Sequence, residues 1–346
     1  MLVLDGSYGE GGGQIVRTAL SLAALTGRAV RLENIRAGRP KPGLRPQHRT
    51  AVQALAQITR AQISGVEVGS SALTFSPQGI FPGDYRFDVA AASGSAGAVS
   101  LVAQTLLPVL AFAAGPTTLV LAGGTHVPWS PPYHYFAWDF LPALGHMGLA
   151  AAAEIQRWGF YPRGGGEIRL RLHPVTRLQG VAWTTPPVRA QFQGLSAAAK
   201  LPAHVLRRQS QTLRRQLSWP LPLREEVPAS PGPGSFVFLW GPQAGFAALG
   251  ARGKPAEEVA GEGARALQAF LTSGAALDRY LADQILIYAA LADGPTQLTA
   301  AAVTRHLLTN IWVIRQFLDV PIEVTGDLER PGTVLVQGRG YRPGGR

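Results

Sequence analysis

The sequence predicts an α/β (α+β) fold of repeated units, on three observations. Pairs of helices with several short strands recur three times along the 346 residues. A composition of 46% hydrophobic and 15% charged residues is typical of a folded globular chain. A segment rich in Arg, Pro and Gly separates the second unit from the third. We therefore expect a main domain in residues 1–185 and 274–338, an inserted α+β domain in 186–273 and a disordered tail in 339–346.

The first unit begins with an apolar strand that leads through a glycine-rich run into a helix. Apolar residues on one face predict that helix, and Gly27 provides its natural end. A short strand, a basic loop, a second helix and further strands follow. These elements are expected at residues 2–4 (strand), 14–26 (helix), 29–32 (strand), 35–48 (loop) and 48–59 (helix), with short strands up to residue 87.

The same order then recurs, with the inserted segment before the third unit. The second unit is expected to contain helices 94–114 and 132–147 and strands 119–122, 150–155 and 167–172. The inserted segment is expected to contain helices 203–217 and 256–271, strands 236–240 and 245–250, and a Pro/Gly/Ser linker at 227–234. The third unit is expected to contain helices 280–291 and 304–318 and strands 322–325 and 334–337.

The charge balance favours a polyanionic partner. Lys and Arg number 32 against 21 Asp and Glu, a formal charge of +11, although basic surfaces also occur on proteins without such a partner. The absence of Cys excludes zinc fingers, disulfides and thiol catalysis. The chain does not open with a signal sequence, and its most apolar run, 101–114, is interrupted by Gln104 and Pro108. We expect a soluble, cytoplasmic protein that does not enter a membrane.

The glycine-rich run at residues 5–14 suggests an anion site. Glycines let backbone N–H groups approach a phosphate, and the helix that follows presents its positive end. The run matches neither the dinucleotide-binding nor the P-loop signature. It contains Glu10, a carboxylate suited to Mg²⁺ or Mn²⁺ beside phosphates. The alternative is a glycine turn with one solvated acid.

Two further stretches are basic. The loop at 35–48 carries Arg36, Arg39, Lys41 and Arg45 among three prolines that limit its motion, so it suits a phosphate backbone or is a solvated basic loop. The helix at 203–217 carries four arginines, for which a solvated face is the favoured interpretation.

His306 is the candidate nucleophile. It lies at the start of a predicted helix, away from the apolar face, where the helix dipole favours a neutral imidazole. The alternative is a structural histidine. Asp283, near another helix start, is expected to cap that helix or bind a ribose. Gln104, inside an apolar run, needs a partner, either a ligand or a backbone carbonyl.

Six ordered blocks, which extend over nearly the whole chain, resemble the RNA 3'-terminal phosphate cyclases. They read DGSYGEGGGQIVRTALSL, IRAGRPKPGLRPQH, GGTHVPWSPP, GFYPRGGGE, YLADQ and HLLTNIWVIRQFL. The resemblance implies that an RNA 3'-phosphate end is converted to a 2',3'-cyclic phosphate with ATP, through adenylate first on a histidine and then on the RNA phosphate, with release of pyrophosphate and AMP. It also implies three βαβα-type repeats with one small inserted α+β domain.

The resemblance also implies site residues. His306 matches the adenylylated nucleophile, and Glu10 matches the carboxylate that holds a divalent metal, Mg or Mn. The matches for nucleotide and phosphate contacts are Gln14, Arg17 and Gln104, those for the adenosine pocket are Pro131, Tyr280 and Asp283, and those near the RNA phosphate are Arg36, Arg39, Gln47 and His48. The chain departs from the family pattern at residues 89–97, which are a few residues longer than the usual turn.

Two other functions remain open at this stage. One is a ribosome-assembly factor on the same fold without catalysis, although such paralogues lack the histidine. The other is a small-molecule transferase resembling the enolpyruvyl transferases. The sequence does not indicate an oligomeric state.

Overall fold

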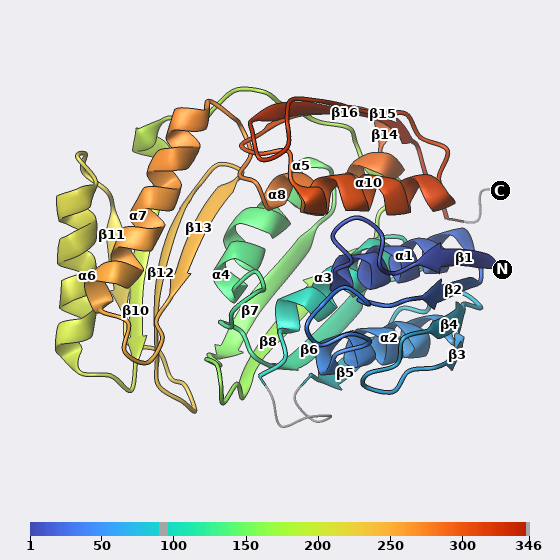
Figure 1. The fold of residues 1–346 in the computed structure, drawn as a ribbon, viewed down its shortest axis with the longest axis horizontal. Helices are drawn as coiled ribbons and strands as arrows, with labels where there is room; N and C mark the ends of the chain where they lie inside the picture. The colour runs from blue at the N-terminus through green and yellow to red at the C-terminus, as the bar shows by residue number, and fades with distance from the viewer. Residues whose placement is uncertain (90–95, 344–346) are drawn as a thin grey trace.

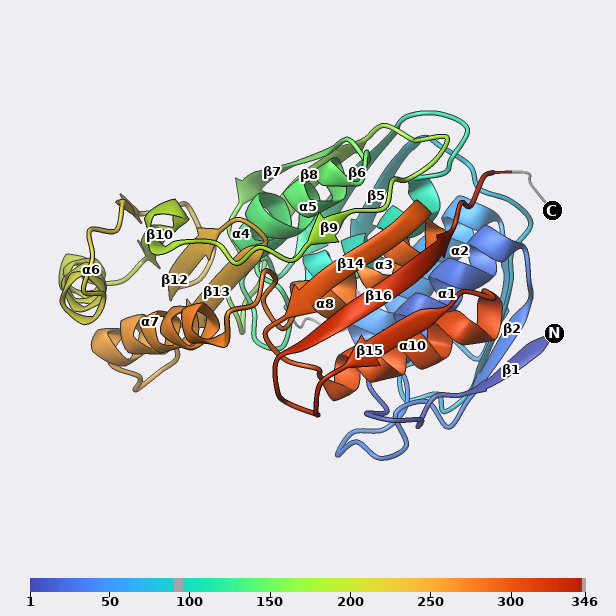
Figure 2. The same ribbon diagram turned by 90° about the horizontal axis from the view of Figure 1, so that it is seen from above.

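The computed structural model describes residues 1–89 and 96–343, and it has a mixed α/β architecture. In this part of the chain, four sheets of four strands each are packed with helices, and one sheet with its two helices forms a lobe at the left of Figure 1. Figure 2 shows the same lobe extending from the main body when the molecule is seen from above. The predicted mixed α/β class is confirmed. The expected longer turn at residues 89–97 lies mostly outside the described residues.

Three of the sheets share one strand order. In each, two parallel strands are followed by two antiparallel ones, and the last strand in sequence lies in the interior of the sheet. The first sheet contains β1 (Leu2–Asp5), β2 (Val30–Glu33), β4 (Leu73–Ser76) and β3 (Gln62–Ser64). The second contains β5 (Asp84–Asp88), β6 (Thr117–Gly123), β8 (Gly166–Leu172) and β7 (Ala151–Arg157). The third contains β9 (Ala182–Trp183), β14 (Asp293–Ala300), β16 (Gly332–Arg339) and β15 (Ile322–Thr325).

The helices of the main body lie between these sheets (Figure 1). They are α1 (Gly13–Thr26), α2 (Pro46–Thr59), α3 (Val99–Leu110), α4 (Tyr133–Tyr135), α5 (Leu141–His146), α8 (Leu281–Gln284), α9 (Leu286–Leu291) and α10 (Arg305–Phe317). A π-helical turn, Phe136–Phe140, joins α4 to α5, and π turns occur frequently at functional sites. Gly27 ends α1 with a φ of 65°, as the sequence predicts.

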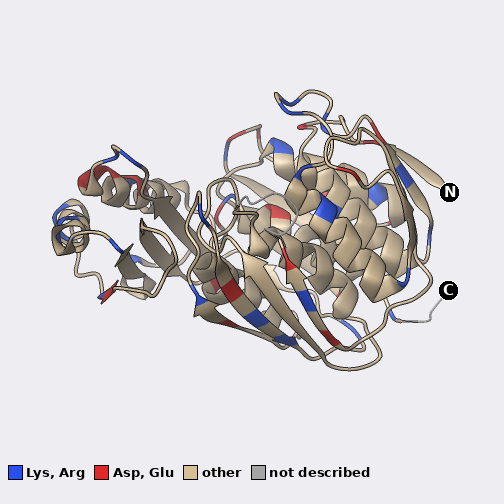
Figure 3. Ribbon diagram, turned by 90° about the horizontal axis from the view of Figure 1, so that it is seen from below, with Lys and Arg blue, Asp and Glu red and all other residues tan. Residues whose placement is uncertain are grey.

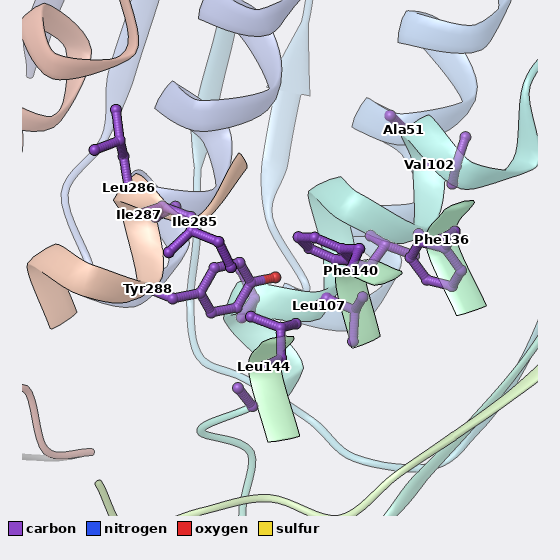
Figure 4. Close-up of a cluster of buried hydrophobic side chains, with 14 of the residues drawn as sticks. Ala51, Val102, Leu107, Phe136, Phe140, Leu144, Ile285, Leu286, Ile287 and Tyr288 are labelled. Carbon is purple, nitrogen blue, oxygen red and sulfur yellow. The ribbon is translucent and has the colours of Figure 1, made fainter. Parts of the chain in front are cut away.

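One buried cluster joins several of these helices (Figure 4). Val102 and Leu107 of α3 meet Phe136 and Phe140 of the π-helical turn, and all four are at most 1% exposed. Tyr288 of α9 packs against Phe140 with its ring centroid 6.0 Å away. This cluster is part of the hydrophobic core that supports α3, the π-helical turn and α9.

The fourth sheet forms the lobe at the left of Figure 1. It contains β11 (Leu223–Glu226), β10 (Gln193–Ala199), β12 (Gly234–Gly241) and β13 (Ala244–Leu249), with α6 (Ala203–Gln216) and α7 (Ala256–Ser273) packed against it. Arg208 of α6 forms an ion pair with Glu257 of α7 at 2.6 Å, in an exposed position. Lys and Arg occur in this lobe as well as in the main body (Figure 3).

The prediction of a disordered tail from residue 339 is wrong for its first residues. Arg339 belongs to β16, and the Tyr341 hydroxyl donates a hydrogen bond to the Leu25 carbonyl at 2.7 Å. The Tyr341 ring also packs edge-on against Phe112. No helix within residues 1–89 and 96–343 is both long and apolar enough to span a membrane.

Candidate active site

A cavity of about 1430 Å³ opens where α1, α3, α8 and α10 meet the loop at 35–48 and the loop at 127–132. All the site residues predicted from the sequence line it, although they come from segments up to about three hundred positions apart. They are Glu10, Gln14, Arg17, Arg36, Arg39, Gln47, His48, Gln104, Pro131, Tyr280, Asp283 and His306. The structure therefore brings the whole predicted set to one place.

A carboxylate bridges an arginine and the candidate nucleophile. Glu10 accepts a hydrogen bond from Arg39 Nη2 at 2.7 Å through one oxygen. Its other oxygen lies 3.3 Å from His306 Nε2. The glycine run places Glu10 close to the first turns of α10. A Cβ on Gly9 would lie 2.5 Å from Thr309 Oγ1, and the φ of Gly9 is +59°. A side chain at position 9 would therefore displace this loop.

His306 stands in the first turn of α10, as predicted. The Thr304 hydroxyl caps this helix by accepting from the Leu307 N–H at 3.0 Å. Burial lowers the pKa of His306 below 6.5, and Arg17 and Arg39 act in the same direction against the charge of Glu10. The ring is therefore neutral over a wider pH range than a solvated imidazole.

Asp283 lies beside the other ring nitrogen of His306, and Arg17 is close enough to act on the charges of both residues. Asp283 Oδ2 lies 3.7 Å from His306 Nδ1. Burial raises the pKa of Asp283 to about 8, against the opposing charge of Arg17. The pKa of Arg17 falls to about 10 through burial. The Arg17 guanidinium makes no hydrogen bond to any part of the chain that the structure describes, so its donors are available to an anion.

Gln14 has one amide atom in use and one without a partner. Its Nε2 donates to the His306 carbonyl at 3.3 Å. Its Oε1 is buried and has no hydrogen-bond partner among the described residues. A buried acceptor without a partner is costly, so this oxygen suits a ligand hydroxyl or a water bound to a metal.

Two of the residues expected near the RNA phosphate also shape the protein itself. His48 accepts from the Arg45 N–H at 3.1 Å and is part of the cap of α2, and burial lowers its pKa to about 3. Its ring packs on Gly13, where an added Cβ would lie 2.1 Å from Nε2. Arg36 Nη1 donates to the Lys41 and Gly43 carbonyls at 2.6 and 2.9 Å, which fixes the fold of the basic loop.

Within the described chain, Gln104 pairs with another side chain rather than with a backbone carbonyl. Its Nε2 donates to Gln284 Oε1 at 2.6 Å, from α3 to α8. One turn earlier on α3, Ser100 donates to the Pro131 carbonyl at 2.5 Å. Residues four apart share a face of a helix, so this side of α3 positions both the 127–132 loop and α8.

The sequence analysis missed Asp278, which lies under the adenosine pocket expected from the family resemblance. Asp278, and not Asp283, binds the N–H groups at the start of α8: Oδ1 accepts from the Tyr280 and Leu281 N–H groups at 2.7 and 3.0 Å. Oδ2 accepts from the Gly245 N–H at 3.1 Å, and the Tyr135 hydroxyl also donates to this carboxylate. An Asp three residues before Leu281 was a usable N-cap signal.

The residues present fit one divalent ion held largely by phosphates. Within residues 1–89 and 96–343, no group of three or more His, Asp or Glu side chains is arranged to hold a metal ion. Mg²⁺ needs fewer, since one or two carboxylates with substrate phosphates and waters suffice. Glu10 offers such a carboxylate, and the unpartnered Gln14 Oε1 is close to the same helix start.

Comparison with known proteins identifies relatives of the same length. The family model of the RNA 3'-terminal phosphate cyclases matches residues 8–324. A protein of Thermococcus onnurineus named RNA 3'-terminal phosphate cyclase is 45% identical, covering 98% of this chain and 99% of its own. One of that name from Methylococcus capsulatus is 47% identical over 99% of this chain and 98% of its own. Among solved structures, the enolpyruvyl transferase NikO of Streptomyces tendae shows 14% identity and a TM-score of 0.42, over 96% of this chain and 48% of its own, a level that supports no inference. The chain thus belongs to the RNA 3'-terminal phosphate cyclase family.

Proposed function

We propose that this protein uses ATP to convert an RNA 3'-phosphate end to a 2',3'-cyclic phosphate through an adenylylated His306. The observation that carries the proposal is the setting of His306. Its ring has a lowered pKa, is partly open to the cavity, and has Glu10, Arg39 and Asp283 around it. A neutral imidazole beside cationic groups is a nucleophile suited to an anionic phosphorus centre.

In the first step, His306 Nε2 attacks the α-phosphorus of ATP. A nitrogen–phosphorus bond forms, the bond from the α-phosphorus to the bridging oxygen breaks, and pyrophosphate leaves. Nε2 is favoured because Nδ1 faces Asp283, whose carboxyl can accept the Nδ1 proton once it ionises. A divalent ion held by Glu10 would supply positive charge for the leaving pyrophosphate. Arg17 and Arg39 add donors for phosphate oxygens.

The next two steps transfer and then release the adenylate. An oxygen of the RNA 3'-phosphate attacks the adenylate phosphorus, the nitrogen–phosphorus bond breaks, and a pyrophosphate-type linkage to RNA forms. The ribose 2'-OH then attacks the 3'-phosphorus and loses its proton, and AMP leaves as the cyclic phosphate closes. His306 takes no part in this third step.

The expected adenosine contacts belong to the same proposal. Pro131 and Tyr280 line the cavity, and Tyr280 is 56% exposed, so its ring is accessible to a base. Asp278 holds the Tyr280 backbone. A ring and a proline on opposite sides of a planar base would bind it through apolar contact.

The test is covalent labelling with ATP that carries ³²P in the α-phosphate. The wild type should retain label that acid releases and alkali does not, as for a phosphoramidate. His306→Ala should retain none, whereas His204→Ala, which removes an exposed histidine of α6, should label normally. His306→Ala should still cyclise RNA that is already adenylylated on its 3'-phosphate. Label on the His306→Ala variant, or an alkali-labile linkage in the wild type, would overturn the assignment.

The same experiment separates the two competing functions. A ribosome-assembly protein without catalysis and an enolpyruvyl-type transferase would both fail to retain AMP. The proposal predicts retention, then loss of the label when RNA with a 3'-phosphate is added. RNA with a 3'-hydroxyl is the matched control, since it has no phosphate to accept the adenylate.

A further inference from the structure

The loop at residues 127–132 presents an exposed tryptophan at the cavity. Trp129 is 97% exposed and also lines the cavity that contains His306. Tryptophan is normally among the more buried side chains, because its ring gains much by leaving water. Binding of a ligand would explain why this indole is almost entirely exposed beside the cavity that contains His306.

The backbone of Trp129 adopts an energetically unfavourable conformation. Trp129 has a φ of 64°, a left-handed conformation that disfavours residues other than glycine. Strained residues of this kind persist where the surroundings fix them, and they gather at functional sites.

The loop is anchored on both sides of the ring. Ser130 Oγ donates to the Val127 carbonyl at 3.0 Å, and Ser100 of α3 donates to the Pro131 carbonyl at 2.5 Å. Val127 is 4% exposed and packs in a small apolar cluster with Leu101. Prolines at 128, 131 and 132 further restrict the loop. Little conformational entropy is therefore lost when a flat partner stacks on the indole.

The position of the ring favours RNA over ATP. His306, Arg17 and Asp283 are half-buried or buried, so the reacting phosphates belong to the enclosed part of the cavity. An ATP molecule fits within 1430 Å³, whereas an RNA strand that delivers its 3' end to His306 must continue outward past the rim. Trp129 lines this cavity and is almost wholly in solvent, so its ring is accessible to a strand that leaves the cavity.

We propose that Trp129 is the stacking platform for a base near the 3' end of the RNA substrate. This inference rests on the proposed function, because it takes the strand's 3'-phosphate to lie at His306. Stacking uses the π face that every base has, so Trp129 would hold RNA without reading its sequence. The stacked base would add binding free energy to the salt-dependent contacts between the arginines and the RNA phosphate backbone.

The experiment compares Trp129→Ala and Trp129→Phe with the wild type. Binding of a short RNA with a 3'-phosphate is measured without ATP, and self-labelling by ATP is measured separately. Trp129→Ala should weaken RNA binding about ten-fold, within the range found for one base–aromatic stack. Trp129→Phe should restore most of the loss, and the ATP concentration needed for half-maximal labelling should be the same in all three proteins.

Abasic RNAs identify the base. An RNA that lacks one base at the first, second or third position from the 3' end is bound to the wild type and to Trp129→Ala. At the stacked position the wild type should lose about ten-fold, and Trp129→Ala should lose nothing further.

The possible failures are distinct. Additive losses at all three positions, or unchanged RNA binding by Trp129→Ala, would reject the stacking role. A loss confined to ATP labelling would assign Trp129 to the nucleotide. Because RNA binding is measured without ATP, it tests Trp129 even if the wild type fails to label, a result that would overturn the proposed function.

Discussion

Replacing Asp278 tests whether one buried carboxylate holds the wall of the site. Its oxygens accept from three backbone N–H groups, those of Gly245, Tyr280 and Leu281, and from the Tyr135 hydroxyl. Asp278 is 1% exposed. It thereby links β13, α4 and the start of α8 around a single side chain.

The cost of Asp278→Asn follows from counting acceptors. The amide keeps one oxygen, which can stay on the Tyr280 and Leu281 N–H groups, while its NH₂ group faces the Gly245 N–H and cannot accept from it. Losing a hydrogen bond to a charged group and leaving a buried N–H unpaired costs about 2–4 kcal/mol. Asp278→Ala removes the acceptor for all four donors and should cost more than about 4 kcal/mol, a large share of a typical total stability of roughly 5–15 kcal/mol.

Urea unfolding followed by circular dichroism measures this cost. The matched control is Asp293→Asn, the same chemical change at a 44% exposed carboxylate that is 3.2 Å from Arg177. Breaking such a surface pair should cost less than about 1 kcal/mol. If Asp278→Asn loses no more stability than Asp293→Asn, the four donors do not depend on this carboxylate and the argument fails.

Three further predictions concern packing and protonation. Gly13→Ala should lose about 1–3 kcal/mol in urea unfolding, because its Cβ would lie 2.1 Å from His48 Nε2, whereas Gly38→Ala, with open space around the new Cβ, should lose much less. Burial, followed by the charge of Asp278, raises the pKa of Asp139 well above 3.8, so the folded state keeps a proton that the unfolded state loses above about pH 4, and stability falls as pH rises. The free energy of unfolding of Asp139→Asn should therefore increase relative to that of the wild type as pH rises from 4 to 8. Parallel profiles of stability against pH would contradict this. In the wild type, kcat/KM for self-labelling should fall as pH drops below 6.5, because His306 becomes protonated. It should rise a second time near pH 8, as Asp283 ionises and accepts the Nδ1 proton. Asp283→Asn should show the first change and lack the second.

Helices were predictable from the sequence where periodicity and end signals agree. α1 and α10 follow apolar faces, and their ends differ from the predicted ones by one residue at most. β14 was missed because Pro295 and polar residues interrupt any strand pattern, and its pairing with β16 and β9 is a tertiary effect. β10 was missed because its alanines carry little strand preference, so neighbouring strands determine its conformation.

The predicted site residues all line one cavity, but their contacts were not predictable and Asp278 was missed. Family resemblance supplied the residues, and local pattern supplied only a few of them, such as Glu10 and His306. Neither indicated that Gln104 binds Gln284, 180 positions away, or that Arg36 holds loop carbonyls. Such pairings depend on the distances between secondary-structure elements, and local sequence does not indicate these distances.

The link between α1 and α10 explains why residues at opposite ends of the chain meet. Thr18 Oγ1 donates to Asn310 Oδ1 at 3.0 Å, and Asn310 Nδ2 donates to the Asp283 carbonyl at 3.3 Å. Together with the hydrogen bond from Gln14 to the His306 carbonyl, these contacts fix the first two turns of α10 against α1 and α8. The same face of α1 carries Arg17, so the packing that buries this helix also sets the cation beside the histidine. Stability and chemistry therefore depend on one helix contact, and a substitution that loosens it should move the imidazole and its neighbouring charges together.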